Sequence, residues 1–202
     1  MTAAYSNALA KQMLTQNALY HIERVTMRQV TVNAQQQFAS WNNITQGQIP
    51  KIMILGMVNS AALSGTHDST PFNFHHYDVM SVTAEINGKQ YPSTSYDLNF
   101  AANYSLQAYE GLLDTLGRLN EPAGELPFHR YVYNKGYTLF GFDFTSSHTG
   151  LNSVALVKQG NLKVNLKFRN PVPDTIVVFC MLVFDNVIEI TNNRDVIFNF
   201  NP

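Results

Sequence analysis

The chain has 202 residues and a mass of 22.7 kDa, which is enough for one substantial domain and hardly for two. Its net charge is −1, and charged residues make up 13% of the sequence, about half the usual share. Binding to bare nucleic acid would select a basic face, whereas no cluster of Lys or Arg occurs here, so we expect no direct sequence-specific nucleic-acid binding.

The N-terminus predicts a helical segment, residues 1–18, ahead of a single domain, residues 19–202. Tyr5, Leu9 and Met13 recur every four residues, with Ala at many of the positions between, as in a short helix over 2–18. These first residues lack the charged and apolar regions of a signal peptide, so we expect none.

The next segments predict a long strand, a loop and a buried strand. Residues 19–33 are rich in β-branched side chains, but their alternation slips near Val25, which a bulge or a strand shared between two surroundings would explain. Residues 34–50 are polar and read as a loop. Residues 51–58 form a short, nearly continuous apolar strand.

A second loop and a hairpin follow. Residues 59–76 are rich in Ser, Thr, Asn and small residues and predict a loop. Residues 77–86 alternate, and the Asn87-Gly88 turn with the return strand 89–92 completes a hairpin. The predicted apolar face of the first strand consists of Met80, Val82, Ala84 and Ile86.

One interior helix is predicted over 103–119, followed by a long loop over 120–136. Gly111 and Gly117 weaken the helix by about 1 kcal/mol each in exposed positions, so packing must stabilise it. Its apolar stripe consists of Tyr109, Leu112, Leu113, Leu116 and Leu119.

The last third of the chain predicts the core strands. In 138–145, Phe140, Phe142 and Phe144 share one face, and in 161–169 apolar and polar residues alternate cleanly. The unbroken apolar run 176–184 predicts a strand buried on both faces, and a polar turn with a short amphipathic strand follows. Its Cys180 reads as a buried structural thiol.

About eight strands with long connections and no alternation of strands with helices indicate an all-β sandwich or barrel. The apolar run 176–184 is too short to span a bilayer, so we expect no membrane span.

No residue pattern points to catalysis, a metal or a cofactor. His67, His75 and His76 lie in one loop region, but they lack the alternate spacing and carboxylate of a metal site on a strand. No nucleophile elbow or phosphate-binding loop occurs. Glu110 and Asp114, one helical turn apart, read as solvated charges. We therefore expect a protein that is not an enzyme and has no cofactor.

Several segments together resemble one family. They are Gly47–Pro50, Pro71–Tyr77, Asn134–Phe144, Lys158–Phe168 and Phe184–Ile190, the last followed by Arg194 and Asp195. In this order they resemble the C-terminal part of the hexon-like major capsid proteins of adintoviruses and related Maverick/Polinton elements. The resemblance extends over nearly the whole chain.

The resemblance implies a jelly-roll sandwich standing upright in a capsid shell, and hence a location in the virion. The family's full proteins resemble double jelly-roll capsid proteins that form pseudo-hexagonal trimers. This chain holds the residues of one jelly roll, so it is either part of a double jelly roll or a short relative that assembles differently.

The expected function is self-association into capsomers and a shell, with copies of the chain or a partner capsid jelly roll as partners. The loops 34–50, 59–76 and 120–136 and the helix 103–119 are the expected contact regions. The candidate assembly contacts are Tyr109, Leu113, Leu116, Asp185, Asn186, Glu189 and Arg194.

Two other functions remain open at this point. A jelly roll that binds a ligand or a receptor would use the same loops. A cupin-type metalloenzyme would need bound iron, manganese or zinc.

Overall fold

The computed structural model of the chain describes residues 3–119, 128–145 and 157–198. Its contacts divide the chain into two compact units: unit 1 comprises residues 1–24 and 185–202, and unit 2 comprises residues 25–184. The elements in chain order are α1 (Ala3–Met13), β1 (Ala18–Val32), β2 (Phe38–Gln48), β3 (Ile52–Asn59), α2 (Ser60–Leu63), β4 (Val79–Ile86), β5 (Lys89–Tyr91), α3 (Leu106–Thr115), α4 (Arg130–Tyr133), β6 (Leu139–Asp143), β7 (Gln159–Phe168), β8 (Ile176–Ile190) and β9 (Val196–Phe198).

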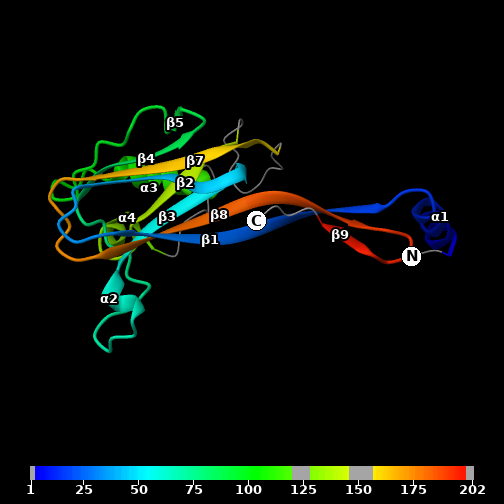
Figure 1. Cartoon of the computed structure of the whole chain (residues 1–202), viewed down its shortest axis with the longest axis horizontal. Coiled ribbons are helices and arrows are strands. Elements are labelled where there is room, and N and C mark those ends of the chain that lie inside the picture. Colours follow the sequence, from blue (N-terminus) through cyan, green and yellow to red (C-terminus); the bar gives the residue numbers. More distant parts are fainter. Residues whose placement is uncertain (1–2, 120–127, 146–156, 199–202) are drawn as a thin grey trace. The chain divides into compact units, whose positions relative to one another are not determined.

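The strands form the two mostly antiparallel sheets of a jelly-roll sandwich. One sheet has the order β1-β8-β3-β6, with β9 paired to β8, and the other has the order β2-β7-β4-β5. Apart from the β4–β5 hairpin, consecutive strands from β1 to β8 alternate between the sheets, as a jelly roll requires. Figure 1 shows the two layers of unit 2. The predicted all-β jelly roll is confirmed.

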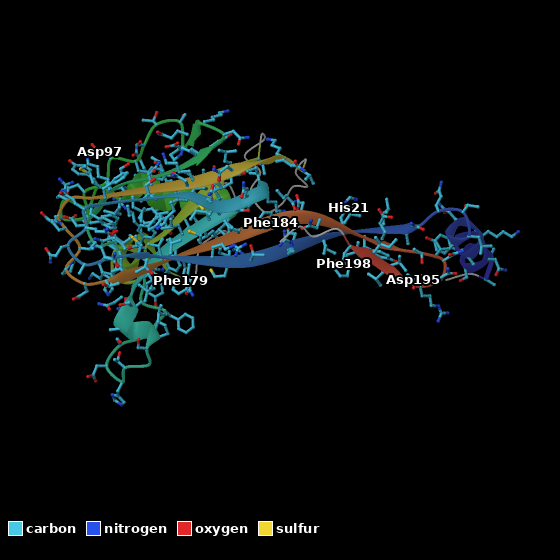
Figure 2. All side chains as sticks on the ribbon, viewed as in Figure 1. His21, Asp97, Phe179, Phe184, Asp195 and Phe198 are labelled. Atoms are coloured by element: carbon cyan, nitrogen blue, oxygen red, sulfur yellow. The ribbon has the colours of Figure 1, made fainter. Side chains whose placement is uncertain are left out.

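The core of unit 2 lies between these layers, where inward rows of both sheets meet. In β7 every second side chain is inaccessible to solvent, and the residues between them are exposed or half-buried, as the alternation predicted. From the other sheet, β3 and β8 contribute facing rows, in which Leu55 pairs with Cys180. Figure 2 shows the side chains crowded around these strands. The inward residues of β7 and β8 are Leu162, Val164, Leu166, Phe168, Ile176, Val178, Cys180, Leu182 and Phe184.

The predicted interior helix is present as α3, but it is shorter than 103–119, and its buried face differs from the predicted apolar stripe. Asn103 has a φ of 59° before the helix, and Gly117 has a φ of 68° after it. The Arg118 N–H donates to Leu113 O at 2.9 Å, so Gly117 ends the helix rather than weakening its interior. The residues buried in α3 are Ala108, Leu112 and Thr115, with the larger predicted residues flanking them.

Close approach of α3 to β6 explains this choice of face. A Cβ atom on Gly141 would lie 2.6 Å from Thr115 Oγ1 and 3.0 Å from Leu112 Cα. Both faces of β6 are therefore buried, because the Phe140 side of the strand meets the core and the Gly141 side meets the helix. The contact requires small side chains, so the spacing of large apolar residues in the sequence does not reveal which face of α3 is buried.

The predicted loop 34–50 is wrong, because most of it forms β2. β2 lies at one edge of its sheet and pairs with β7, with a register shift between Trp41 and Thr45. Only Ala39 and Ile44 are buried in it. An edge strand that is largely polar and interrupted by a bulge shows no period of two in its sequence, so it resembles a loop.

Two predicted faces also need correction. The run 176–184 is not buried on both sides throughout, because Val177, Phe179 and Met181 are only half-buried. On that face Phe74 lies over Gly56 of β3, and α3 lies over β6. In β4 a register shift between Val79 and Ser81 places Val79 in the core and leaves Met80 half-buried. In β4, the pairing with β7 and its bulge decide which side chains face the core, and a strict alternation does not.

Unit 1 contains the short N-terminal helix, which is confirmed as α1, and parts of three strands. They are residues 18–24 of β1, 185–190 of β8, and β9, which pairs with β8 through Ile188 and Phe198. The boundary between the units in β1 lies between Arg24 and Val25, where the sequence alternation slips.

We predict that Gly141→Ala lowers the free energy of unfolding by about 1–3 kcal/mol, because the new methyl group collides with Thr115 and the backbone of α3. Urea unfolding measures this cost. Adding Thr115→Ala removes the closest of the three contacts, Thr115 Oγ1 at 2.6 Å, and leaves Thr115 Cβ at 2.8 Å and Leu112 Cα at 3.0 Å. The double variant should therefore lose at least about 0.5 kcal/mol less than the sum of the single changes. Strict additivity would show that the helix does not lie this close to β6.

Candidate functional site

The three candidate contacts on the helix lie at the margin of the core. Tyr109, Leu113 and Leu116 are half-buried and pack against core residues. The ring of Tyr109 meets the buried ring of Tyr133 edge-on, with 5.4 Å between their centroids. These side chains thus stabilise α3 on the sandwich and keep part of their surface free, and their contact with a neighbouring subunit stays a prediction.

The other four candidates lie together in unit 1. Asn186 Oδ1 accepts a hydrogen bond from Arg24 Nε at 3.1 Å, and Glu189 Oε2 accepts one from Asn17 Nδ2 at 3.2 Å. Asp185 is half-buried and also interacts with a neighbour. Arg194 is exposed in the turn before β9, with a φ of 67°. Asn186 and Glu189 therefore tie β8 to the chain around β1, and a role between subunits stays a prediction.

The three predicted contact loops contain different elements in the structure. Most of 34–50 is β2, as described above. The segment 59–76 carries α2 and projects from the sandwich in Figure 1. Residues 120–127 lie outside the described residues, and the rest of the segment 120–136 includes α4, where Tyr131 is 89% exposed.

Unit 1 also carries an apolar surface that was not predicted. No side chain described in unit 1 is buried. The described part of unit 1 consists of α1 and paired strands, whose side chains Figure 2 draws as sticks. Successive strand side chains point to opposite faces, so Leu19 and Tyr20, like Ile197 and Phe198, expose apolar side chains on both faces of the paired strands. Such side chains are normally covered by another layer, so their exposure is unusual. Its large apolar members are Tyr5, Leu9, Leu14, Leu19, Tyr20, Val187, Val196, Ile197 and Phe198.

The sequence held a partial signal for this surface. The helical repeat of Tyr5 and Leu9 and a short amphipathic strand near the C-terminus were predicted, but the sequence did not indicate whether these side chains are covered. Burial depends on whether a second layer is present, and no local pattern reports that.

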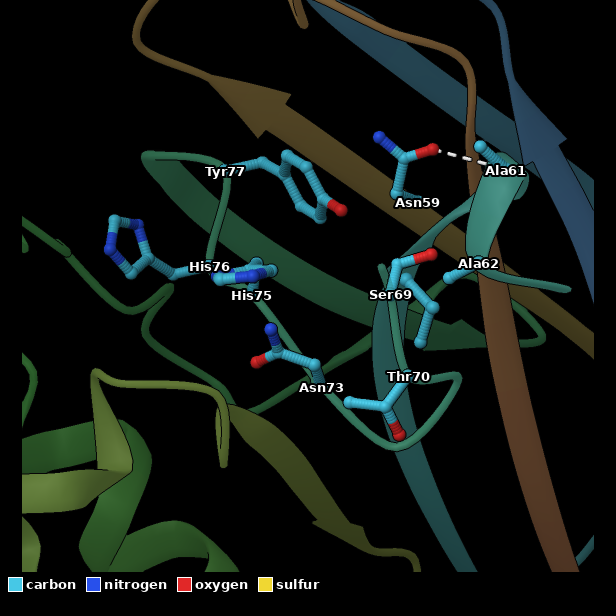
Figure 3. A pocket seen from close by; sticks show the side chains of 10 residues that line it. Asn59, Ala61, Ala62, Ser69, Thr70, Asn73, His75, His76 and Tyr77 are labelled. Carbon is cyan, nitrogen blue, oxygen red and sulfur yellow. Dashed lines mark hydrogen bonds between the residues drawn. The ribbon is translucent and has the colours of Figure 1, made fainter. Parts of the chain in front are cut away.

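An open pocket lies in unit 2 between β3 and the segment that leads into β4. It has a volume of about 500 Å³. Figure 3 shows that its side chains come from the end of β3, from α2 and from the segment before β4. Its polar lining residues include Asn59, Ser69, Thr70, Asn73, His75 and Tyr77.

Tyr77 is the least satisfied polar group of this pocket. Its hydroxyl is buried and has no hydrogen-bond partner among the described residues. Burial raises the pKa of the phenol to about 12, with a smaller effect from Asp174, so the phenol is neutral at physiological pH. Tyr77 and Asp78 both have left-handed backbones, with φ values of 45° and 51°.

His76 is fixed by its neighbours. Its ring stacks on Phe100 with 4.1 Å between centroids, and its Nδ1 accepts a hydrogen bond from the Asp78 N–H at 2.9 Å. Burial lowers the pKa of His76 below 6.5; the Asp78 carboxylate opposes this effect, and His75 adds to it. Both the hydrogen bond and the lowered pKa favour the neutral imidazole.

In the described part of the chain, no three His, Cys, Asp or Glu side chains lie close enough together to bind a metal ion. His148 lies outside the described residues. Cys180 is confirmed as a core thiol: it is inaccessible to solvent, and burial raises its pKa to about 12. Each helix described is too short or too polar to cross a membrane.

Comparison with known proteins identifies one curated relative, and no family model matches the chain. Over 134 residues the chain is 34% identical to the uncharacterized protein F54H12.2 of Caenorhabditis elegans. The match covers 65% of this chain and 32% of that protein. The chain thus corresponds to about a third of the length of this relative.

Solved structures with a similar fold come from viruses. VP54 of PBCV-1, as fitted into a reconstruction of the Sputnik virophage, matches all of the chain with a TM-score of 0.55 at 10% identity. A Sputnik virophage structure matches 91% of the chain with a TM-score of 0.52 at 14% identity, and the PBCV-1 capsid matches 93% with 0.52 at 11% identity. The chain covers 55%, 39% and 52% of those chains, so the fold of this chain corresponds to a part of each of them.

We predict that stability falls as the pH drops below about 6.5, because the folded state holds His76 with a lowered pKa and the unfolded state binds the proton more readily. This contribution is fully present above the unfolded pKa and is lost as the pH falls toward the folded one. Urea unfolding between about pH 5 and 8 measures the slope.

His76→Gln should flatten that slope, since Gln does not titrate. The control is His67→Gln at an exposed position, which should leave the slope unchanged. An unchanged slope in His76→Gln would contradict the assignment.

Proposed function

We propose that this chain is a structural subunit of a capsid-type shell and that it assembles with copies of itself or with a partner jelly roll. The observation that carries the proposal is the uncovered apolar surface of unit 1. Large apolar side chains are exposed on its helix and on all three of its strands, and none of its described side chains is buried.

A physical argument connects this surface with assembly. A sheet whose apolar side chains face water forgoes the free energy that their burial would contribute. Covering a large apolar side chain contributes about 1.5–3 kcal/mol, so burial of several of the nine large apolar residues of unit 1 against a neighbour would stabilise the unit substantially. Surfaces of this kind mark sites of protein association.

The charges of the chain are compatible with close packing between subunits. Its net charge is −1, and only 13% of its residues are charged, so few unpaired charges would be buried when subunits meet. The polar contacts of Asn186 and Glu189 already lie within unit 1, which leaves the apolar side chains as the main unsatisfied surface.

The fold supports a capsid role of a particular type. A jelly roll whose fold matches parts of PBCV-1 and Sputnik structures fits a major capsid protein. Together with the resemblance to adintovirus and Maverick/Polinton proteins, this supports a hexon-like capsomer, trimeric in its complete form and located in the virion. The protein then has a structural role and is not an enzyme.

The proposal predicts self-association that depends on unit 1. Sedimentation velocity or mass photometry across concentration should show oligomers of this chain or of a longer protein that contains it. The variant Leu19→Lys/Ile197→Lys places two charges on the apolar surface and should shift the distribution to monomers, because burying an unpaired charge is costly.

Asn192→Lys/Asn193→Lys is the matched control, since it adds the same charge in the exposed turn without removing apolar surface. It should leave the oligomers largely intact. A strict monomer at all concentrations, or equal loss of assembly in both variants, would rule out assembly through this surface.

A further inference from the structure

We propose that the apolar surface of unit 1 in one copy binds a second apolar surface, which lies around α4 in unit 2 of the next copy. This inference rests on the proposed function and adds the partner of unit 1. Contact between two different surfaces is head-to-tail, and such contacts generate closed rings when the rotation between copies closes. The second surface, called here the aromatic surface, consists of Tyr104, Leu106, Phe128, Tyr131, Val132 and Tyr137.

The aromatic surface comes from two segments that hydrogen bonds hold side by side. One segment leads into α3 and the other contains α4, which contacts α3 within unit 2 (Figure 1). Arg130 Nη2 donates to Asn103 O at 3.4 Å. Ser105 Oγ donates to Asn134 Oδ1 at 2.9 Å. The six apolar side chains therefore belong to one region of unit 2.

Three tyrosines supply most of the exposed area of this surface. The exposed fractions are 69% for Tyr104, 89% for Tyr131 and 47% for Tyr137. An aromatic side chain buries about 150–250 Å², so these three can contribute about 400 Å² to a contact. That is half of the roughly 800 Å² that each partner supplies in a stable interface. Tyr is also enriched among the residues that dominate binding energy.

The core beneath the aromatic surface holds it in place. Tyr133 is inaccessible to solvent, and its hydroxyl donates to Leu139 O at 2.7 Å. Thr138 Oγ1 donates to Tyr133 O at 2.9 Å. The ring of Phe128 stacks on that of Tyr137, with 5.0 Å between centroids. Side chains on an ordered segment lose less entropy on binding, which favours them as contact residues.

The aromatic surface carries a positive charge. Residues 103–106 and 128–138 contain two cations, Arg130 and Lys135, and no Asp or Glu. Both cations are exposed. Complementary charges guide association and suppress wrong partners, so this surface favours a partner surface with an excess of acids.

Unit 1 has that excess. With His neutral, its strand segments 18–24 and 185–198 contain four acids and two bases, which gives a charge of −2, and Lys11 of α1 brings the unit to −1. Two copies of unit 1 that face each other would therefore repel, whereas unit 1 and the aromatic surface attract. The acids are Glu23, Asp185, Glu189 and Asp195, and the bases are Arg24 and Arg194.

The first test truncates the aromatic surface. Tyr104→Ala/Tyr131→Ala changes two highly exposed side chains, so the unfolding midpoint should stay nearly unchanged. The concentration at which half of the protein is assembled should rise at least about tenfold in sedimentation velocity, because two anchors of the contact are lost. Met27→Ala/Phe38→Ala is the matched control, since it truncates two exposed side chains of unit 2 outside this surface, and it should leave assembly unchanged.

The second test mixes two variants. Leu19→Lys/Ile197→Lys retains the aromatic surface and disables unit 1, and Tyr104→Ala/Tyr131→Ala does the reverse. At a concentration where each variant alone is monomeric, an equimolar mixture should form one-to-one pairs, because the intact aromatic surface of the first binds the intact unit 1 of the second. Sedimentation with a fluorescent label on one variant detects these pairs.

The outcomes separate this inference from the proposed function. If Tyr104→Ala/Tyr131→Ala assembles like the wild type while Leu19→Lys/Ile197→Lys is monomeric, unit 1 has a different partner surface and this inference alone is overturned. A mixture that contains only monomers, or an equal loss of assembly in the Met27→Ala/Phe38→Ala control, also overturns it. A wild-type protein that stays monomeric at all concentrations contradicts the proposed function, and this inference with it.

Discussion

The packing of two apolar rows against each other is the constraint on which the structure depends. The inward side chains of β7 meet those of β3 and β8, and nearly all of them are removed from water. Burial of this apolar area is the main favourable term in folding. Because strand side chains alternate, fixing one row inward fixes the opposite row outward, and the register of each neighbouring strand follows. The bulges in β2 and β4 adjust those strands to this register.

The same constraint separates the two units in physical terms. Unit 2 has two layers and therefore a core, which makes it a rigid block that can hold a pocket and a strained segment such as Tyr77–Asp78. The described part of unit 1 has paired strands and a helix but no buried side chain. A surface that lacks its second layer can complete its burial with another chain. In the proposed function, unit 2 is therefore the rigid block and unit 1 is the part that associates with a neighbouring chain.

Sequence reasoning was most successful where one physical effect dominated. The alternation of β7, the Asn87-Gly88 hairpin and the buried Cys180 were predicted correctly because apolar period and turn chemistry decide them locally. It was wrong for β2, whose pairing partner stabilises a polar segment with little pattern of its own. It placed the interior helix correctly but expected large residues at a contact where Gly141 requires small ones.

The sequence by itself determined the fold class, the strands of the core and the absence of a recognisable catalytic motif, because these follow from the order and spacing of residue types. Only the tertiary structure decided which apolar side chains of unit 1 are exposed, and that the buried Tyr77 hydroxyl has no hydrogen-bond partner among the described residues. Both properties depend on what lies across from a residue in space. Segments distant in the sequence supply those neighbours, so no local pattern encodes them.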